Sequence, residues 1–395
     1  MTGAAPLPQP LPLEEAWARL LDGIRPLPGE ALAIEDAAGR HLAAPLSAHV
    51  TRPAADLSAM DGYAVAGEGP WTVTGESRCG APFAGTLASG QAARISTGAV
   101  MPAGADRVLI QEDALRDGDR LALAADLPGP GANVRRRGID FEQGDALLPA
   151  GSRLGARQIA LALSAGVDTV PVHRAPQVAI LDCGDELVDG SIPATNGAML
   201  AAMVAGLPCA VRRIGPVADD PGALGAALAR CEGCDLVLTS GGASVGDHDL
   251  VRPALEAWGA QIAFWRVAIR PGKPLLVARR EGTLVLGLPG NPVSAFVTGF
   301  LFALPALRAM LGAPDPLPRA SHLPVAADLP AGGPRGEFMR AVLRGGQADP
   351  IRERDSSLLA QLARADALIW RPPHCAGTKA GTDVPVYHLE NGAIA

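Results

Sequence analysis

The stretch LVLGLPGNPVSAF, Leu284–Phe296, joins an apolar run to a helical pattern through one short turn. The run that ends at Gly287 has the length and apolar character of a buried strand. Gly290 permits a tight turn with positive φ, and Asn291 and Pro292 suit the N-cap and the first position of a helix. We therefore predict a strand, a turn and a helix whose free N-terminal amides point toward the ligand edge of a sheet.

The same succession of strand and helix occurs repeatedly between residues 176 and 312. Strand-like and helix-like segments alternate in the order QVAILDC, TNGAMLAAMVAG, CAVRRIGPV, DDPGALGAALARC, CDLVLTS, DLVRPALEAWG, TLVLGLP and NPVSAFVTGFLFAL. Such alternation favours an α/β fold with a doubly wound, mostly parallel sheet that helices cover on both faces. Ligands of such sheets bind beyond the carboxyl ends of the strands.

The flanking parts of the chain are rich in short strands and turns. Residues 51–140 contain runs such as WTVTG and DRVLIQE, and residues 317–395 contain runs such as VPVYHL. We accordingly expect a β-rich domain of residues 51–140, an α/β domain of residues 176–316 and a small β-rich domain of residues 317–395.

Composition narrows the class of protein. The chain has 395 residues, 48% hydrophobic and 19% charged, as in soluble proteins with a substantial core. A net charge of −7 without a basic arm argues against nucleic-acid binding. The N-terminus has no secretory signal, and the run AFVTGFLFALPALRAML, broken by Pro305 and Arg308, is predicted to be a buried helix too short to span a membrane. A cytoplasmic location is expected by default.

Six cysteines are too few for a disulfide scaffold in a chain of this length. Cys231 and Cys234 form a C-x-x-C sequence, but no second pair occurs at zinc-finger spacing. Its flanks are typical of a helix end that leads into a buried strand. A structural role is favoured, and redox or metal chemistry is the alternative.

A second junction between strand and helix contains a loop with few side chains. The sequence TSGGASVGDHD places Gly241, Gly242, Ser244 and Gly246 before the helix. With the loop at Gly290, it suggests a pocket whose backbone amides bind phosphate, although well-capped structural helices would give the same pattern. Neither a Walker nor a Rossmann nucleotide motif is present.

Charged residues accompany these loops. Arg270 and Lys273 flank a Pro-Gly turn at Gly272, where they could neutralise phosphate charge or form a solvated hairpin. Asp185 and Glu186 follow the first strand of the sheet, and Asp247 and Asp249 follow the glycine-rich loop. Carboxylates beside phosphate-binding amides suggest Mg²⁺, held by Asp185, Glu186 and Asp249. The alternative is that Asp247 or Asp249 only caps the next helix.

Motifs along nearly the whole chain occur in the order of one known family. They are DLSAMDGYAV, STGAVMPAGADRVLIQED, NVRRRGIDFEQGD, CGDEL, SGGASVGDHD, RPGKP and GLPGNPVSAF. Through them the chain resembles the molybdopterin molybdenumtransferase family. The resemblance implies four sub-domains, in which residues 12–50 and 141–175 form a discontinuous elongated dimerisation domain and residues 51–140 are inserted between them. It further implies an elongated homodimer and a cleft to which both subunits contribute. It also implies molybdate and adenylylated molybdopterin as substrates, release of AMP with Mg²⁺, and other cofactor-synthesis proteins or a molybdoenzyme as further partners.

Matching positions imply roles for individual residues. Catalytic roles fall to Asp56, Thr97, Asp140, Asp185, Glu186 and Asp249. Binding of the pterin nucleotide involves Gly241, Gly242, Ser244, Gly246, Arg270, Gly272, Lys273, Pro289, Gly290, Asn291 and Ser294. Ser58 and Asp61 support the site, and Ser356 and Ser357 of the C-terminal domain are expected to reach the partner's cleft.

Several positions depart from the family pattern. Ile139 replaces the Glu of a GED motif, Leu57 stands where Asn is frequent, and Cys183 replaces a Thr before GDEL. We favour the molybdenum-inserting enzyme. These departures leave open a molybdopterin-binding relative that carries cofactor without efficient insertion, and a third alternative is an enzyme that cleaves another phosphoanhydride.

Overall fold

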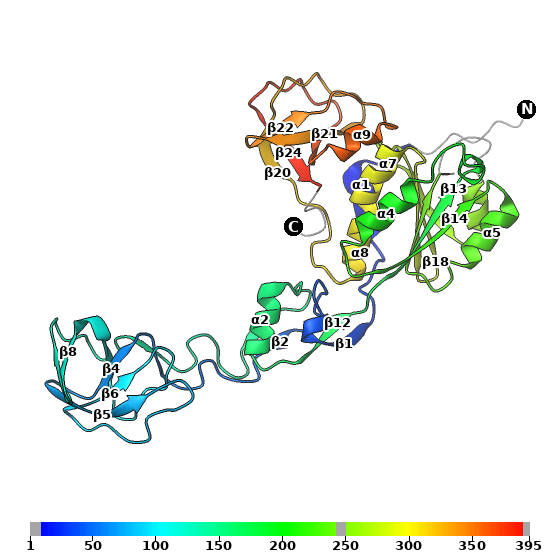
Figure 1. The fold of residues 1–395 in the computed structure, drawn as a ribbon. Helices are drawn as coiled ribbons and strands as arrows, with labels where there is room; N and C mark the ends of the chain where they lie inside the picture. The colour runs from blue at the N-terminus through cyan, green and yellow to red at the C-terminus, as the bar shows by residue number, and fades with distance from the viewer. Residues whose placement is uncertain (1–8, 242–249, 390–395) are drawn as a thin grey trace, which may run out of the picture.

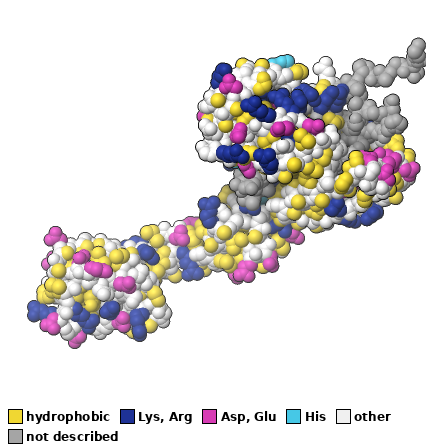
Figure 2. Space-filling model, turned by 45° about the horizontal axis from the view of Figure 1, so that its top comes forward, with side chains coloured by type: hydrophobic (Ala, Val, Ile, Leu, Met, Phe, Trp, Pro, Cys, Tyr) yellow, Lys and Arg dark blue, Asp and Glu magenta, His cyan; other side chains and the backbone are white. Residues whose placement is uncertain are grey.

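A computed structural model describes residues 9–241 and 250–389 of the chain. The molecule is elongated: a small β-rich lobe lies at one end, the α/β region and the C-terminal region lie together at the other, and a narrow segment connects them (Figure 1). The space-filling view shows the same narrow connection (Figure 2). It also shows acidic side chains gathered on one side of the α/β region.

The α/β region is built on one six-stranded sheet with the strand order β14-β13-β15-β19-β18-β16. The first four strands are parallel, and β18 runs antiparallel to both of its neighbours. The mostly parallel sheet is therefore confirmed, whereas the alternating pattern had not indicated the strands β16 and β18. The bounds are β13 Gln177–Cys183, β14 Ala210–Val217, β15 Leu236–Ser240, β16 Gln261–Arg266, β18 Pro274–Arg280 and β19 Thr283–Leu288.

Helices cover both faces of this sheet because side chains alternate along each strand. Val178 and Ile180 of β13 face the core with one set of helices, and Ala179 and Leu181 face the core with the other. The first set comprises α1 Leu13–Leu21, α4 Asn196–Val204, α7 Pro292–Thr298 and α8 Leu304–Met310. The second set comprises α5 Pro221–Ala229 and α6 Val251–Ala257, and the short helix α3 spans Asp185–Val188.

The helices α7 and α8 form one long core helix through a π-helical segment, Gly299–Ala303. The sequence predicted a break at Pro305, but the wider π-helical turn precedes this proline and accommodates its ring. By length and composition alone, the 19 residues Pro292–Met310 are long enough to cross a membrane, contrary to the expected shortness. However, 89% of the apolar 18-residue stretch within this helix is buried inside the protein, as in a core helix.

The β-rich lobe contains a six-stranded sheet with the order β7-β4-β6-β5-β9-β8. Strand β3, which precedes this sheet in the sequence, pairs with β10, which follows it, to form a separate two-stranded sheet. The bounds are β3 Leu57–Ser58, β4 Gly62–Val65, β5 Trp71–Ser77, β6 Gln91–Ile95, β7 Arg107–Ile110, η2 Gln111–Asp113, β8 Ala114–Asp117, β9 Arg120–Leu123 and β10 Val134–Arg135.

The connecting segment has its own apolar cluster, which includes Ile34, Leu42, Leu154 and Val172. Two short antiparallel pairs, β1 with β12 and β2 with β11, bring its two sequence stretches together. The bounds are β1 Gly29–Ala33, η1 Ile34–Asp36, β2 Leu46–Ser47, β11 Ala146–Leu148, α2 Ala156–Ser164 and β12 Thr169–His173.

The C-terminal region shares a sheet with the α/β region. Strand β17, Ile269–Arg270, lies between β16 and β18 in sequence but pairs with β21 in the order β17-β21-β23-β24-β20. The ring of Phe300 meets that of Tyr387 edge to face and strengthens this contact. The other bounds are β20 Ser321–Pro324, β21 Gly336–Arg344, β22 Gln347–Pro350, α9 Leu359–Ala363, β23 Ala367–Arg371 and β24 Asp383–His388.

Candidate functional site

A cavity of about 680 Å³ lies at the carboxyl ends of β13, β15 and β19. This is the edge where open α/β sheets bind ligands. The segment after each of these strands contributes to its wall, and Ser357 and Leu359 of the C-terminal region close another side. Of the residues that the resemblance assigns to catalysis or to binding of the pterin nucleotide, Glu186, Gly241, Pro289, Gly290 and Asn291 line this cavity.

Gly241 is required where it stands. Its φ is +90°, and a Cβ atom added to it would lie 2.3 Å from the carbonyl oxygen of Cys183. Its amide donates to Leu288 O at 3.3 Å, so the loop after β15 lies directly against the loop after β19. The other predicted residues of the glycine-rich loop, namely Gly242, Ser244, Gly246, Asp247 and Asp249, lie outside the described residues.

The turn before α7 differs from the prediction in detail. Gly290 does not have a positive φ; a Cβ atom on it would lie 3.6 Å from Gly241 Cα, so close approach of two loops explains the glycine. Asn291 is the N-cap residue, but its side chain makes no capping hydrogen bond and lines the cavity instead. Pro292 is at the start of the helix as predicted.

The N-terminus of α7 is partly occupied by the C-terminal region. The amide of Val293 donates to Ser356 O at 3.0 Å, so this amide is not free for phosphate. Ser294 is buried within the helix and is not among the residues that line the cavity. Ser357 was expected at a partner's cleft, but the structure places it in the wall of the cavity of its own chain.

One end of the cavity is acidic. Glu186 and Asp219 line it, and Asp185 accepts a hydrogen bond from the Asp219 amide at 2.9 Å. Burial raises the pKa of the Asp219 carboxyl, and the charges of Asp185 and Glu186 raise it further. This repulsion is what a bound cation would relieve. Within residues 9–241 and 250–389, however, no three Asp, Glu, His or Cys side chains already form a metal-binding group.

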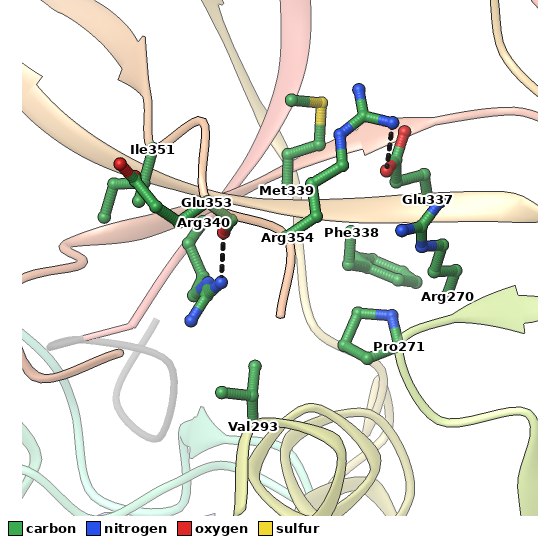
Figure 3. Close-up of a pocket in the computed structure, with 10 residues that line it drawn as sticks. All are labelled: Arg270, Pro271, Val293, Glu337, Phe338, Met339, Arg340, Ile351, Glu353 and Arg354. Carbon is green, nitrogen blue, oxygen red and sulfur yellow. Dashed lines mark hydrogen bonds and ion pairs between the residues drawn. The ribbon is translucent and has the colours of Figure 1, made fainter. Parts of the chain in front are cut away.

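The basic segment 270–273 lies between the large cavity and a smaller one. Gly272 has φ +102°, and a Cβ atom on it would lie 2.5 Å from Thr298 Cγ2, so only glycine fits against α7. Pro274 lines the large cavity, and Lys273 directly precedes it. Arg270 lies instead at a small cavity beside the C-terminal region, close to Glu337 (Figure 3). Neither Arg270 nor Lys273 is therefore among the residues that line the large cavity.

That small cavity has a volume of about 20 Å³, room for a single water. Arg340, at its edge, donates to Leu358 O at 3.1 Å and to Asp355 O at 3.2 Å. Figure 3 shows this arginine directed at the chain that follows Ile351. Arg340 therefore holds the segment that brings Ser357 to the large cavity.

The remaining predicted residues lie in the β-rich lobe, away from the cavity of the same chain (Figure 1). Asp56 accepts from the Arg137 amide at 2.8 Å and from Arg136 Nη1 at 2.6 Å. Both interactions, the amide bond first, lower the pKa of Asp56. Thr97 is exposed, and its amide donates to Asp61 at 2.7 Å.

Two further predicted site residues, Ser58 and Asp140, belong to this lobe. Ser58 is fully buried, and its hydroxyl donates to Met60 O at 2.5 Å, so it shapes the loop. Asp140 is exposed, and its neighbour Ile139, which replaces a family glutamate, is 68% exposed. Within one chain, the lobe residues and the cavity residues are not brought together.

Sequence reasoning missed Asn196 and Asp219, which both line the cavity. The helix-like segment DDPGALGAALARC begins with Asp219 and Asp220, so the pattern assigns both to the start of a helix. In the structure, only Asp220 caps α5, where it accepts hydrogen bonds from the amides of Gly222 and Ala223 at 2.9 Å. Asp219 could have been predicted from its position in the sequence, because it follows β14 at the edge of the sheet where ligands bind.

Cys231 and Cys234 lie at the other end of the sheet from the cavity, directly before β15. Both are buried free thiols, and burial raises the pKa of Cys231 to about 12. A thiol with so high a pKa is a poor metal ligand or nucleophile at neutral pH, which supports the structural role.

Comparison with known families covers most of the chain. Residues 11–166 match the MoeA N-terminal region (domain I and II), residues 179–309 match a probable molybdopterin binding domain, and residues 322–389 match the MoeA C-terminal region (domain IV).

Individual relatives agree with these matches. A molybdopterin molybdenumtransferase of Haemophilus influenzae is 36% identical over 316 residues, covering 76% of this chain and 78% of the relative. Molybdopterin molybdenumtransferase 2 of Mycobacterium tuberculosis is 31% identical over 397 residues, covering 94% and 97%. A crystal structure of the molybdopterin biosynthesis moeA protein of Pyrococcus horikoshii superposes with a TM-score of 0.83 at 27% identity, covering 96% of this chain and 100% of that chain.

Proposed function

Since the chain belongs to the molybdopterin molybdenumtransferase family, we propose that it transfers molybdenum from molybdate to molybdopterin, the last step of molybdenum cofactor biosynthesis. The form of the pterin that it uses is the adenylylated one, and AMP is the leaving group. The observation that carries this proposal is the cavity at the ends of β13, β15 and β19, where backbone loops meet a carboxylate cluster.

The two ends of the cavity suit a substrate of this kind. At one end, Gly241, Pro289, Gly290 and Asn291 present backbone with few side chains, so that phosphate groups can approach closely. At the other end stand Glu186 and Asp219, which repel phosphate unless a cation lies between. Lys273, which directly precedes Pro274 of the cavity wall, is assigned to substrate binding for its positive charge.

Mg²⁺ is assigned to the acidic end, where the described carboxylates alone do not form a complete metal site. Asp185, Glu186 and Asp219 would contribute to it, together with Asp249 expected from the sequence, because carboxylate oxygens are the ligands that Mg²⁺ prefers. When bound, Mg²⁺ neutralises phosphate charge at the anhydride. The raised pKa of Asp219 supports this assignment, because its carboxylate lacks a cation partner among the described residues.

Asp56, Thr97 and Asp140 serve the reaction in a homodimer. They lie in the β-rich lobe, so they can complete a cleft only on a second subunit (Figure 1). Apolar surface on the connecting segment supports dimerisation there: Leu163 of α2 is 43% exposed, and Ala162 is the one fully buried residue of this helix. The domain boundaries at residues 50, 140, 175 and 316 and the cytoplasmic location belong to the same proposal.

A cofactor carrier without efficient insertion is the second candidate. The exposed apolar side chain of Ile139, next to Asp140, favours it, since a carboxylate is lost beside residues that are assigned to the reaction.

The test is an assay of purified protein with adenylylated molybdopterin, Mg²⁺ and molybdate. AMP release together with active cofactor is the expected result. Tight pterin binding without AMP release would favour the carrier. Cleavage of another nucleotide without pterin binding would overturn both candidates.

A further inference from the structure

Asn196 lies where the two loops of the cavity meet. It is the first residue of α4, and only 9% of it is exposed. Its Nδ2 donates to Ser240 Oγ at 2.8 Å and to Gly290 O at 2.7 Å. One side-chain amide therefore joins the end of β15 to the turn before α7.

The backbone at Asn196 is itself held from the end of β13. The amide of Gly197 donates to Asp182 Oδ1 at 2.8 Å, and Arg213 Nη2 lies 3.4 Å from Asp182 Oδ2. A Cβ atom on Gly197 would lie 2.0 Å from Asp182 Oδ2, so no residue larger than glycine fits after Asn196. The link formed by Asn196 thus spans three neighbouring strands.

The orientation of the Asn196 side-chain amide is fixed, and it leaves one of its polar atoms without a hydrogen bond. Its Oδ1 is buried and has no partner among the described residues. Rotating the amide by half a turn would place Oδ1 against the Gly290 carbonyl, so the observed orientation is the one with two good bonds. A buried acceptor left unpaired lowers stability and offsets part of the gain from the two donated hydrogen bonds. The two bonds hold the amide in the one orientation that links Ser240 to Gly290.

We infer that Asn196 is a positioning residue for the transfer reaction, an inference that rests on the proposed function. It sets the spacing between the end of β15 at Ser240 and the turn at Gly290. A substrate bound in the cavity beside these two segments has its anhydride positioned by both of them. A displacement of about 1 Å in such a site is enough to lower the rate about 100-fold.

The test replaces Asn196 with Ala and measures kcat and substrate affinity separately. We expect kcat to fall about 30-fold, because the reacting groups lose alignment, while the dissociation constant of adenylylated molybdopterin changes less than about threefold. Ser240→Ala keeps the bond to Gly290 and should give a smaller loss of kcat. The double variant should be no slower than Asn196→Ala, because both changes remove the same link.

Thr283→Val is the matched control. Thr283 Oγ1 donates to Cys234 O at 2.7 Å, a bond of the same kind at the opposite end of β19. This variant should lose stability but keep its kcat. If Asn196→Ala fails to fold, Ser240→Ala and its comparison with Thr283→Val carry the test.

The outcomes separate the two claims. Active wild-type protein with unchanged kcat in Asn196→Ala and Ser240→Ala would overturn the inference alone. A loss of substrate affinity that equals the loss of kcat/KM would also overturn it, because Asn196 would then act in binding. Wild-type protein without AMP release would overturn the proposed function, and the inference with it.

Discussion

Carboxylates in the β-rich lobe and carboxylates at the cavity have opposite surroundings. In the lobe, Asp56 and Asp61 accept hydrogen bonds from backbone amides, and Arg136 adds an ion pair to Asp56. At the cavity, Asp219 is half-buried, and its pKa is raised because burial and the charges of Asp185 and Glu186 outweigh the opposite effect of a hydrogen bond with the Asp185 amide. A carboxylate whose negative charge is stabilised by amides and an arginine can hold a loop in place. A carboxylate whose charge is destabilised by neighbouring carboxylates can instead be stabilised by a bound cation.

The largest expected effect tests the cavity side of this contrast. Asp219→Asn should lower turnover about 100-fold, because it removes one of the carboxylates that we propose to bind the divalent cation. The adjacent Asp220→Asn is the control: Asn caps a helix about as well as Asp, so the unfolding free energy should change by less than about 0.5 kcal/mol and turnover should be kept. Steady-state AMP release and urea unfolding measure the two effects. Equal turnover in the two variants would contradict the role of Asp219.

Two glycines with equally tight surroundings compare the regions directly. Gly241 at the cavity and Gly104 in the lobe both have positive φ, and an added Cβ would lie 2.3 Å and 2.2 Å from a carbonyl oxygen. Replacement of either by Ala should lower the unfolding free energy by about 1–3 kcal/mol. Only Gly241→Ala should also weaken pterin binding in direct titration. Equal loss of binding in both would show that the cavity alone does not hold the pterin.

Charge removal should change stability in opposite directions at pH 7 without Mg²⁺. Asp219→Asn removes repulsion and should raise the urea midpoint, while Asp56→Asn removes attraction and should lower it. The pKa of Asp56 is lowered from 3.8, so its contribution is present above pH 3.8 and is lost as the pH falls through the lower folded-state value. The difference between wild type and Asp56→Asn should therefore shrink in acid. Shifts of the same sign at pH 7 would contradict the contrast.

The smallest effect is expected at the lobe surface. Ile139→Glu restores the family carboxylate at a side chain that is 68% exposed. Stability should stay within about 0.5 kcal/mol of wild type. For an efficient enzyme, AMP release should also change little. A large gain in rate would favour the carrier as the native function.

Much of the α/β region followed from the sequence, because its strands are buried on both faces and form continuous apolar runs. QVAILDC and CDLVLTS became β13 and β15 with nearly the predicted bounds. β16 and β18 were missed because they form an antiparallel hairpin after α6, which the alternation of strand and helix does not signal. The family motifs, rather than periodicity, indicated the four-part organisation.

The candidate site was predictable where backbone requirements dominate and less so where distant segments meet. Glycines at positions 241 and 272 marked loops that tolerate no side chain. The role of Gly290 was misjudged because its neighbour is Gly241, 49 positions earlier in the chain, which no local pattern reveals. Asn196, Asp219 and Ser357 reach the cavity only through the packing of strands and of the C-terminal region.

A crystal structure with adenylylated molybdopterin and Mn²⁺ in place of Mg²⁺ tests the central claim most directly. We predict the pterin nucleotide in the cavity between Gly241 and Gly290, with an anomalous peak for Mn²⁺ bound by the Asp219 carboxylate. A nucleotide bound elsewhere, or a manganese peak at Asp56 of the lobe and none at Asp219, would contradict the account.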